Sequence, residues 1–365
     1  MADTLNDLKA QIDQGKQKEV IATISNILKK SDKVPDVHRL LAFAYLKDGS
    51  YKKAVTELQT ARKMGTSAEN ELAFGRMLRG EKFFEAAQTC FKAAEKIEPH
   101  NVDALALISM THQSLGETKQ MLEQGQRCLE MTDRLASQQA VPPLPLPDNL
   151  PAFDPKARKR NVISYSLFGN NTFYLESAIA CASMAVAIFP EWTCRFYCGP
   201  DIPKSTIKTL QRLRAQIVLM PKPSNNWSGL FWRFTAFDDP NVDFVMVRDV
   251  DSPFTIRERM VVDEWLDSPF PFHAIRDDPN HMEPLMAGMW GGRTGILPPV
   301  APLVQTYLPF IKIRYADQHF LRLNIWPRIC DITLSHDRHY SLRNSRKPPE
   351  HPTQDKVNIG FGLPR

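Results

Sequence analysis

Hydrophobic positions in the first third of the chain recur with a period close to 34 residues. Aligning Val20, Ala54, Ala87 and Met121 gives spacings of 34, 33 and 34, and apolar or small residues follow four and seven positions later in most copies. Repeats of this length, each too short to bury its own apolar face, predict paired antiparallel helices that stack into a solenoid. The fourth copy is the weakest, because Gly125 is a poor residue inside a helix.

Turn residues complete the repeat. Glycines precede each expected second helix, aromatic residues lie three positions before two of the central alanines, and a proline follows one second helix: Gly15, Gly49, Gly80, Gly116, Tyr51, Phe84 and Pro99. The stretch of about residues 3–135 resembles the tetratricopeptide repeat, which implies a helical packing platform. A groove that binds a peptide or protein partner and a platform for docking or self-association both remain open.

A proline-rich linker is expected over residues 136–159, between an N-terminal domain over 1–135 and a second domain over 160–365. Proline at this density stops helices and favours a stiff, extended spacer. The basic cluster Lys156 to Arg160 closes the linker. It is interpreted as a solvated entry to the first strand, with a membrane surface or an acidic partner as the alternative.

In the second domain the pattern changes to short apolar runs that alternate with helical segments. The expected strands are 161–167, 193–198, 216–220 and 244–247, and the expected helices are 174–189, 207–215 and 231–237. This alternation predicts a mostly parallel sheet between helices.

The fourth apolar run ends in Arg248 and then in Asp249 and Asp251. Carboxyl ends of strands form the ligand-binding edge of an open α/β sheet, and two nearby carboxylates can share one divalent cation such as Mg²⁺ or Mn²⁺. The alternative is a plain turn and helix start, with Ser252 as the cap and Pro253 as the first helical residue.

Composition narrows the function classes. A hydrophobic content of 43% and a charged content of 24% are typical of a globular protein, and a net charge of +5 without dense basic runs argues against nucleic-acid binding. Neither a dinucleotide-binding glycine motif nor a P-loop follows the first strand. The six cysteines lack metal-ligand spacing. With no basic leader and no apolar run of membrane-spanning length, the protein is expected to be cytoplasmic.

Further motifs follow the aspartates in a fixed order. A helical segment carries Glu258 to Leu266, and then come a strand at 272–275, a small-residue segment at 286–292, the run 315–321 and the run 334–337. From about residue 160 to 362 this succession resembles glycosyltransferases of the GT-A fold. More narrowly, it resembles bacterial proteins that join tetratricopeptide repeats to a glycosyltransferase-like domain with an Arg-Asp-x-Asp-Ser motif. The resemblance implies a Rossmann-like mixed sheet flanked by helices.

The same resemblance assigns a metal site. Asp249 and Asp251 match the metal-binding Asp-x-Asp, and His336 lies where glycogenin-like members supply a third ligand. A Mn²⁺ or Mg²⁺ ion held there would neutralise the diphosphate of the donor. For His336 a structural role is the alternative.

Donor and sugar contacts are also implied. Gly288, Asp317 and Gln318 are similar to the small-residue loop and Asp-Gln pair that contact the transferred sugar, and capping a helix is the alternative for Asp317. Arg233 and Arg248 are candidates for binding a phosphate or the donor.

Each remaining candidate has a structural alternative. Arg248 could instead form a salt bridge to Asp277 or Glu258. Asp277, Asp278 and His281 lie in the loop expected near the acceptor, where one of them could act as a general base, with solvated loop charges as the alternative.

The chain departs from the glycogenin-like pattern at its C-terminal end. It reads His336-Asp337-Arg338-His339-Tyr340 where that pattern has a Lys-Pro-containing motif, so Arg338, Arg343 and Arg346 are the substitutes considered for the cation that meets the diphosphate. Whether the reaction retains or inverts configuration is left open.

These observations predict a metal-dependent hexosyltransferase that uses a UDP- or GDP-linked sugar and a polysaccharide, glycolipid or protein acceptor. One rival is an interaction scaffold whose sugar-nucleotide domain is catalytically silent. Another is a nucleotidyltransferase, although such an enzyme usually opens with a glycine-rich basic loop, which is absent after Leu167.

Overall fold

The computed structural model describes residues 2–28, 34–139, 141–142, 144, 146–147, 149–223, 227–310, 315–350 and 358–362. The chain divides into two compact units, Met1–Cys128 and Leu129–Arg365. The division falls inside helix α8 (Thr118–Ser137), whereas the sequence suggested a boundary after residue 135.

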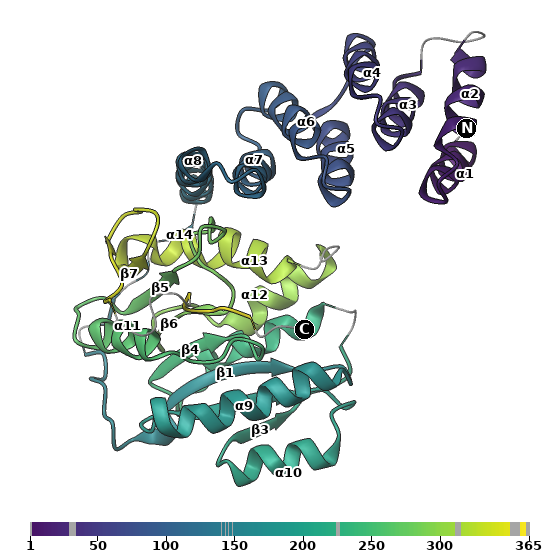
Figure 1. Ribbon diagram of the computed structural model, residues 1–365. Coiled ribbons are helices and arrows are strands. Elements are labelled where there is room, and N and C mark those ends of the chain that lie inside the picture. The colour runs from purple at the N-terminus through teal and green to yellow at the C-terminus, as the bar shows by residue number, and fades with distance from the viewer. Residues whose placement is uncertain are drawn as a thin grey trace. The chain divides into compact units, whose positions relative to one another are not determined.

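Within the described residues, the first unit is built from successive helices (Figure 1). Besides α8, these are α1 (Ala2–Asp13), α2 (Gln17–Leu28), α3 (Pro35–Lys47), α4 (Tyr51–Lys63), α5 (Ala68–Gly80), α6 (Phe84–Ile97) and α7 (Val102–Ser114). Consecutive helices such as α3 and α4, or α5 and α6, pack against each other. The predicted helical repeat is confirmed.

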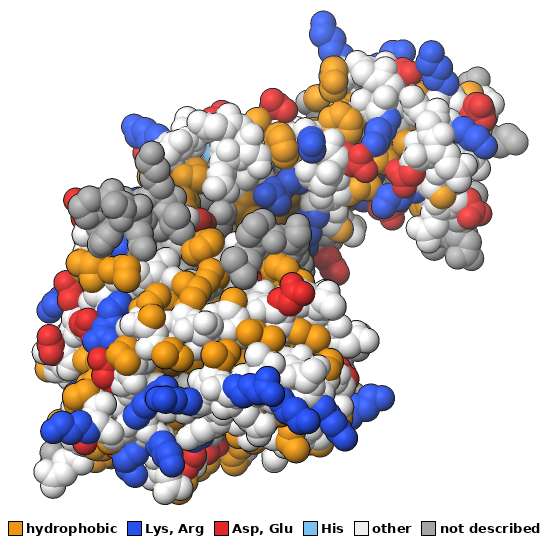
Figure 2. Space-filling model, turned by 60° about the horizontal axis from the view of Figure 1, so that its bottom comes forward, with side chains coloured by type: hydrophobic (Ala, Val, Ile, Leu, Met, Phe, Trp, Pro, Cys, Tyr) orange, Lys and Arg blue, Asp and Glu red, His pale blue; other side chains and the backbone are white. Residues whose placement is uncertain are grey.

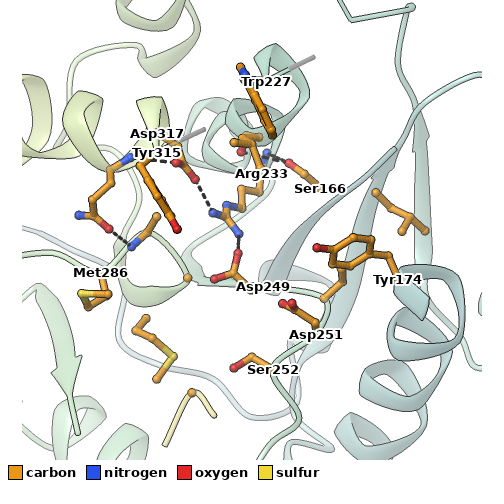
Figure 3. A pocket seen from close by; sticks show the side chains of 18 of the residues that line it. Ser166, Tyr174, Trp227, Arg233, Asp249, Asp251, Ser252, Met286, Tyr315 and Asp317 are labelled. Carbon is orange, nitrogen blue, oxygen red and sulfur yellow. Dashed lines mark hydrogen bonds and ion pairs between the residues drawn. The ribbon is translucent and has the colours of Figure 1, made fainter. Parts of the chain in front are cut away.

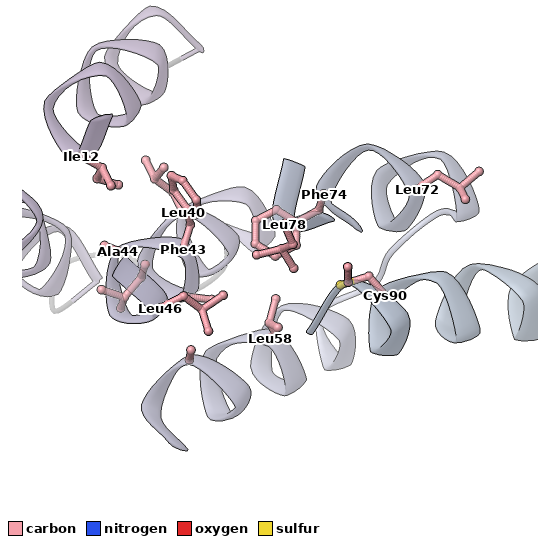
Figure 4. Close-up of a cluster of buried hydrophobic side chains, with 14 of the residues drawn as sticks. Ile12, Leu40, Phe43, Ala44, Leu46, Leu58, Leu72, Phe74, Leu78 and Cys90 are labelled. Carbon is pink, nitrogen blue, oxygen red and sulfur yellow. The ribbon is translucent and has the colours of Figure 1, made fainter. Parts of the chain in front are cut away.

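The repeat register has a direct structural meaning. Val20, Ala54 and Ala87 are fully buried at equivalent positions of α2, α4 and α6, and Met121 is buried in α8. At two of these points the small side chains of Ala54 and Ala87 let neighbouring helices approach closely, and larger apolar residues of the same core fill the space around them (Figure 4).

The turns before the second helices correct one detail of the predicted repeat. Gly15, Gly49 and Gly116 adopt left-handed φ angles of 82°, 78° and 75°, each five residues before the aligned position. In the third copy the residue five before Ala87 is Lys82, with φ of 64°, and Gly80 is the last residue of α5. A lysine therefore takes the strained turn position that glycine occupies elsewhere.

The second unit contains a mixed sheet in which eight strands are found among the described residues, in the order β3-β2-β1-β4-β6-β5-β7-β8. They are β1 (Asn161–Leu167), β2 (Thr193–Cys198), β3 (Gln216–Leu219), β4 (Phe244–Arg248), β5 (Phe272–Arg276), β6 (Met289–Arg293), β7 (Thr333–Asp337) and β8 (Ser345–Arg346). Only β6 runs antiparallel to its neighbours in these pairings. The predicted mixed, mostly parallel sheet is confirmed.

Helices cover both faces of this sheet (Figure 1). On one face, α9 (Thr172–Ile188), α10 (Lys204–Arg212) and α11 (Ile256–Leu266) share an apolar core with β1, β2 and β4. On the other, the 3₁₀ segment η2 (Ser228–Asp238) packs against β1 and against α12 (Val300–Tyr307). There Phe237 stacks on Trp290 with ring centroids 4.9 Å apart.

Shorter elements complete the second unit. They are η1 (Arg158–Arg160), η3 (Leu308–Phe310), α13 (Ala316–Phe320), a π-helical turn η4 (Leu321–Ile325), α14 (Trp326–Ile329) and η5 (Cys330–Ile332). No helix in the described ranges is long and apolar enough to cross a membrane.

Two arginines of the basic cluster at the end of the linker bond to neighbouring parts of the second unit. Arg158 donates to the carbonyl of Trp192, and Arg160 forms a two-bond ion pair with Asp243. These contacts tie the entry to β1 to its two neighbouring strands, so the two arginines are not simply solvated.

The strand order reverses direction at β1. Strands β2 and β3 lie on one side of it, and β4 with the remaining strands lies on the other. In open α/β sheets the loops leaving two such strands diverge at their carboxyl ends and open a crevice. The sheet topology therefore positions a ligand site next to Leu167 and Arg248.

Candidate functional site

A cavity of about 440 Å³ opens at this switch point (Figure 3). Its walls come from the ends of β1 and β4, the start of α9, the segment η2, the loop before β6, α13 and the chain near Gly360. The volume lies within the usual range for small-molecule sites.

Asp249 and Asp251 lie in a turn that directly follows the carboxyl end of β4. The amide of Ser252 donates to the carbonyl of Asp249 at 3.2 Å, which closes the turn, and both carboxylates line the cavity. The helix that follows starts only at Ile256, with Thr255 as its N-cap, accepting from the amide of Glu258 at 3.0 Å. The alternative interpretation of Ser252 as the helix cap is wrong.

Two contacts fix this turn from outside it. The thiol of Cys181, on α9, donates to the carbonyl of Val250 at 3.2 Å, and the hydroxyl of Ser252 donates to the carbonyl of Phe361 at 3.3 Å. Burial raises the pKa of Cys181, so its thiol keeps the proton that it donates. Sequence reasoning missed both contacts, since each joins segments distant in the chain.

Gly288 lies against Asp249. A Cβ at this position would overlap Oδ2 of Asp249 and would lie 2.5 Å from its Cγ and 2.9 Å from its backbone nitrogen. The sequence singled out Gly288 for close approach to a ligand. The structure shows that its missing side chain makes room for the aspartate.

Arg233 joins two of the cavity's carboxylates. Its buried guanidinium forms ion pairs with Oδ1 of Asp249 and, at 2.9 Å, with Oδ2 of Asp317. Burial raises the pKa of Asp317 while the charge of Arg233 opposes the shift. The predicted candidates Asp249, Arg233 and Asp317 are thus brought together in one chain of charges.

Gln318 holds the loop that carries Gly288. Its Oε1 accepts from the amide of Ala287 at 2.9 Å, and its Nε2 donates to the carbonyl of Leu285. Both ends of the amide are bound to backbone, so in this structure Gln318 positions the loop instead of offering a polar group to a sugar.

Arg248 does not reach the cavity. It is 1% exposed, donates to Glu258 at 2.6 Å and to the carbonyl of Trp290 at 2.9 Å, and does not line the site. The predicted donor-binding role is wrong, and the alternative of a salt bridge to Glu258 is confirmed. A buried guanidinium requires such partners.

Asp277 is also structural. It is 0% exposed, forms two bonds of 2.8 Å with Arg257, and accepts from the amide of Ile359 at 2.7 Å. A fully buried carboxylate engaged in this way is out of reach of an incoming acceptor, whereas a general base must lie within hydrogen-bond distance of it. The predicted role of Asp277 as a general base is wrong. Its neighbour His281 does line the cavity, and burial lowers its pKa.

His336 lies apart from the two aspartates. It is buried on β7, where its Nε2 bonds Glu264 at 2.9 Å, and β5 and β6 lie between β7 and β4. Strands are spaced by about 4.8 Å, so a side chain this far across the sheet cannot share a cation with Asp249. The predicted third ligand is wrong.

The C-terminal arginines considered as cation partners are likewise absent from the cavity wall. Arg343 binds Asp133 at 2.8 Å and Ser137 at 2.7 Å, and Arg338 donates to Asn358 at 3.3 Å. Neither these two nor Arg346 appears among the described residues that line the site.

The two remaining metal-binding candidates, Asp249 and Asp251, fit a divalent cation only if water and substrate supply its other ligands. No cluster of three histidine, cysteine, aspartate or glutamate side chains suited to a metal occurs in the described part of the chain. Mg²⁺ and Mn²⁺ commonly use one or two carboxylates and complete their coordination with water and substrate phosphates. Asp249, whose side chain is 46% exposed, and Asp251 match that arrangement.

Aromatic side chains frame the cavity. Tyr174, Trp227 and Tyr315 lie around it, and Tyr315 is among the most exposed large side chains described (Figure 3). None was a candidate from sequence. In the sequence each of them is only an aromatic residue in or beside a polar loop. Such residues are too common in proteins to indicate a binding site.

Comparisons with known proteins give no family. No family model matches the chain, and no curated protein matches it. Among solved structures, MamA matches 36% of this chain and 78% of its own at 18% identity, with a TM-score of 0.26. An O-GlcNAc transferase mutant from Thermobaculum terrenum matches 60% of this chain and 42% of its own at 17% identity, with a TM-score of 0.28. Likenesses at this level establish neither a shared fold nor an activity.

Proposed function

We propose that this protein is a metal-dependent glycosyltransferase that moves a hexose from a nucleotide-diphosphate sugar to a hydroxyl acceptor. The observation that carries the proposal is the pair Asp249 and Asp251, held in a turn at the carboxyl end of β4 and lining a cavity at the switch point of the sheet. This is where an open α/β sheet binds nucleotides.

The charges around the cavity require a cation for such a donor. Three aspartates and one arginine line it, and Arg233 is the single lysine or arginine among the described lining residues. A diphosphate entering this wall would be repelled unless a divalent ion joined it to Asp249 and Asp251. When bound, Mn²⁺ or Mg²⁺ would act as a Lewis acid that stabilises the departing nucleotide.

The chain's own residues would position the sugar. Asp317 is buried and fixed by Arg233, so its remaining lone pairs are suited to accept hydrogen bonds from sugar hydroxyls. Gln318 would act indirectly, by holding the Gly288 loop against Asp249. Tyr174, Trp227 and Tyr315 offer aromatic surface on which a nucleobase could stack.

The acceptor is proposed as a class only: a polysaccharide, a glycolipid or a protein. The helical unit would bind the acceptor, a partner protein or a second copy of the chain. The cytoplasm is the proposed site of action, since sugar nucleotides are the donors. An interaction scaffold with a silent second unit is less favoured, because a silent unit has no need to hold two repelling carboxylates at the mouth of a cavity.

Ligand-induced thermal stabilisation tests the proposal. The melting temperature of the whole protein is measured with UDP, GDP, CDP and their common sugars, each with Mn²⁺ and with a chelator. A ligand that binds only the folded state raises the melting temperature by mass action. We expect one nucleotide class to give a shift in Mn²⁺ that disappears with the chelator.

The variant Asp251→Asn sharpens this test. Removing one of two metal-binding charges should weaken Mn²⁺-dependent nucleotide binding by about 10-fold or more, a loss of about 1.4 kcal/mol. Asp267→Asn is the matched control, because Asp267 is exposed beyond α11 and away from the cavity. Equal nucleotide affinity of Asp251→Asn and the unchanged protein in Mn²⁺ would refute the metal assignment.

The products separate the remaining alternatives. A glycosyltransferase incubated with its donor releases the nucleoside diphosphate, either by slow hydrolysis or on transfer. Consumption of a nucleoside triphosphate with release of pyrophosphate would instead identify a nucleotidyltransferase. A well-folded protein that binds no nucleotide would favour the scaffold.

A further inference from the structure

Helix α9 has a mixed outer side, on which the apolar residues Val186 and Ala187 are exposed together with Thr172, Glu176 and Ser183. Its 17 residues contain Glu176 as the one charged side chain. Inward positions such as Ala178, Cys181 and Ala185 are buried, as expected, but Val186 on the outside is 46% exposed. The outer side of α9 thus presents Val186 next to small polar side chains and a single carboxylate.

Helix α10, which packs beside α9 on the same face of the sheet, is basic. Lys204, Lys208 and Arg212 are spaced four residues apart and are all exposed, so they form one stripe along the helix. The segment 202–223, which includes Arg214 and Lys222, contains no aspartate or glutamate. The stripe therefore has no acidic partner within its own segment.

The edge of the sheet continues this surface. β3 is the terminal strand of the described sheet and pairs with β2 on one side only. Its last residue, Leu219, is 73% exposed, the largest exposure among the large hydrophobic side chains described. Figure 2 shows the result on this side of the molecule: a row of blue lysine and arginine side chains running alongside a band of orange hydrophobic ones.

We propose that the surface formed by α9, α10 and β3 docks onto an anionic lipid bilayer. Lysine and arginine side chains are attracted to acidic headgroups, while apolar side chains beside them enter the boundary between headgroups and acyl chains. The protein would lie on the membrane without crossing it. The inference concerns a surface outside the cavity and does not depend on the proposed transfer reaction.

Other occupants of this surface fit less well. A second copy of the chain would bring one basic stripe near another, and like charges would repel. A soluble polyanion would satisfy the stripe on α10 but would leave the exposed apolar side chains Val186 and Leu219 without a partner. A bilayer with acidic headgroups satisfies both halves of the surface.

The surface also adjoins the cavity. Tyr174, in the first turn of α9, lines it. A protein docked through α9 would therefore hold its cavity close to the headgroup layer, where a lipid-borne acceptor would be found. This consequence would favour the glycolipid among the acceptor classes.

Sedimentation with vesicles tests the docking surface. The whole protein is mixed with vesicles of phosphatidylcholine alone, or of phosphatidylcholine and phosphatidylglycerol in equal amounts. We expect binding to the anionic vesicles only, weakened by added salt. The triple variant K204Q/K208Q/R212Q should lower the vesicle partition coefficient about 100-fold, at about fivefold per basic residue.

Matched variants separate the surface from net charge. K9Q/K16Q/K18Q removes the same charge from exposed positions on the helical unit and should bind vesicles like the unchanged protein. Val186→Ser with Leu219→Ser should weaken vesicle binding while leaving binding to soluble dextran sulfate unchanged.

Three results would overturn the proposal. They are absence of binding to anionic vesicles, an equal loss in the two triple variants, and tight binding to dextran sulfate with none to vesicles. The melting temperature of each variant without any ligand, compared with that of the unchanged protein, shows whether the variant is folded.

Discussion

Asp249 is held by an ion pair on one carboxylate oxygen and is given room by a missing side chain at the other. Arg233 pairs with Oδ1, and the absent side chain of Gly288 leaves the space in which Oδ2 lies. Gln318 fixes the loop that carries Gly288, and Cys181 fixes the turn that carries Asp249. The position of one carboxylate thus depends on four residues from four different segments, none adjacent to it in the chain.

Gly288→Ala tests this dependence. The added methyl group must displace the Asp249 carboxylate or its backbone, because the overlap involves backbone as well as side-chain atoms. We expect Mn²⁺-dependent nucleotide affinity to fall about 10- to 100-fold, the usual cost of disturbing the support of a metal ligand. Titration calorimetry of the metal-nucleotide pair gives the value.

Gly362→Ala is the matched control for that substitution. A Cβ at Gly362 would meet no atom within 4 Å, and its φ angle is not left-handed. Nucleotide affinity should be unchanged in this variant. If Gly288→Ala also kept full affinity, the close contact with Asp249 would have no functional weight.

At the scale of the elements, a buried polar layer lies between the sheet and α11. Arg248 pairs with Glu258, and His336 bonds Glu264, both from α11. His273 stacks on Trp265 with ring centroids 4.2 Å apart. These contacts attach α11 to the sheet through groups that tolerate burial only when each stays in one charge state.

His273 makes this attachment sensitive to acid. Burial, and then the nearby charges of Arg248 and His336, hold the pKa of His273 well below its ordinary value of 6.5. The unfolded chain therefore takes up a proton as the pH falls below about 6.5, whereas the folded protein does not. The free energy of unfolding should decrease as the pH falls from about 6.5 to about 5, by up to about 1.4 kcal/mol per pH unit for each such histidine.

Urea unfolding at a series of pH values measures this slope. All six tryptophans lie in the second unit, so their fluorescence reports that unit alone. His273→Leu should flatten the slope, whereas His100→Leu, at an exposed site on the helical unit, should not. Glu258 and Asp317 have raised pKa values in the folded protein, so the folded protein binds protons at these carboxyl groups more readily than the unfolded chain does. At lower pH these two groups therefore increase the free energy of unfolding, opposite to the effect of His273. An unchanged slope in His273→Leu would show that other groups govern the acid response.

At the scale of the whole molecule, the second unit begins before the proline-rich segment. Leu129, Thr132 and Ala136, in the last turns of α8, are almost fully buried. Oδ1 of Asp133 accepts from Nε1 of Trp326 at 2.7 Å and from Arg343 at 2.8 Å. The last turns of α8 are therefore part of the packing of the second unit.

Two fragments test this boundary. Residues 129–365 keep the partners of Trp326 and Arg343, whereas residues 160–365, the domain predicted from sequence, lack them. We expect the shorter fragment to be less stable by at least about 1–3 kcal/mol, since a buried donor is left unpaired and apolar surface is exposed. Urea unfolding followed by tryptophan fluorescence compares them. If the two fragments were equally stable, the second unit would begin after the linker, as the sequence predicted.

Local pattern was enough to predict several parts of this protein. The 34-residue recurrence gave the helical repeat, and the run that ends in Asp249 and Asp251 gave a strand with two carboxylates at a sheet edge. Both are properties of neighbouring residues: the period of apolar positions and the abrupt end of an apolar run. For the same reason the bounds of β1 and β2 agree with the structure.

What the tertiary structure decided is the partner of each charged side chain. Arg248, Asp277 and His336 are residue types that are common in functional sites. Each is nevertheless buried against a partner from another segment, and these partners are Glu258, Arg257 and Glu264 respectively. Arg233, by contrast, lies among aromatic residues in the sequence and is folded into the cavity. Charge alone cannot distinguish a group that is neutralised within the fold from one left for a ligand, because that depends on which strands become neighbours.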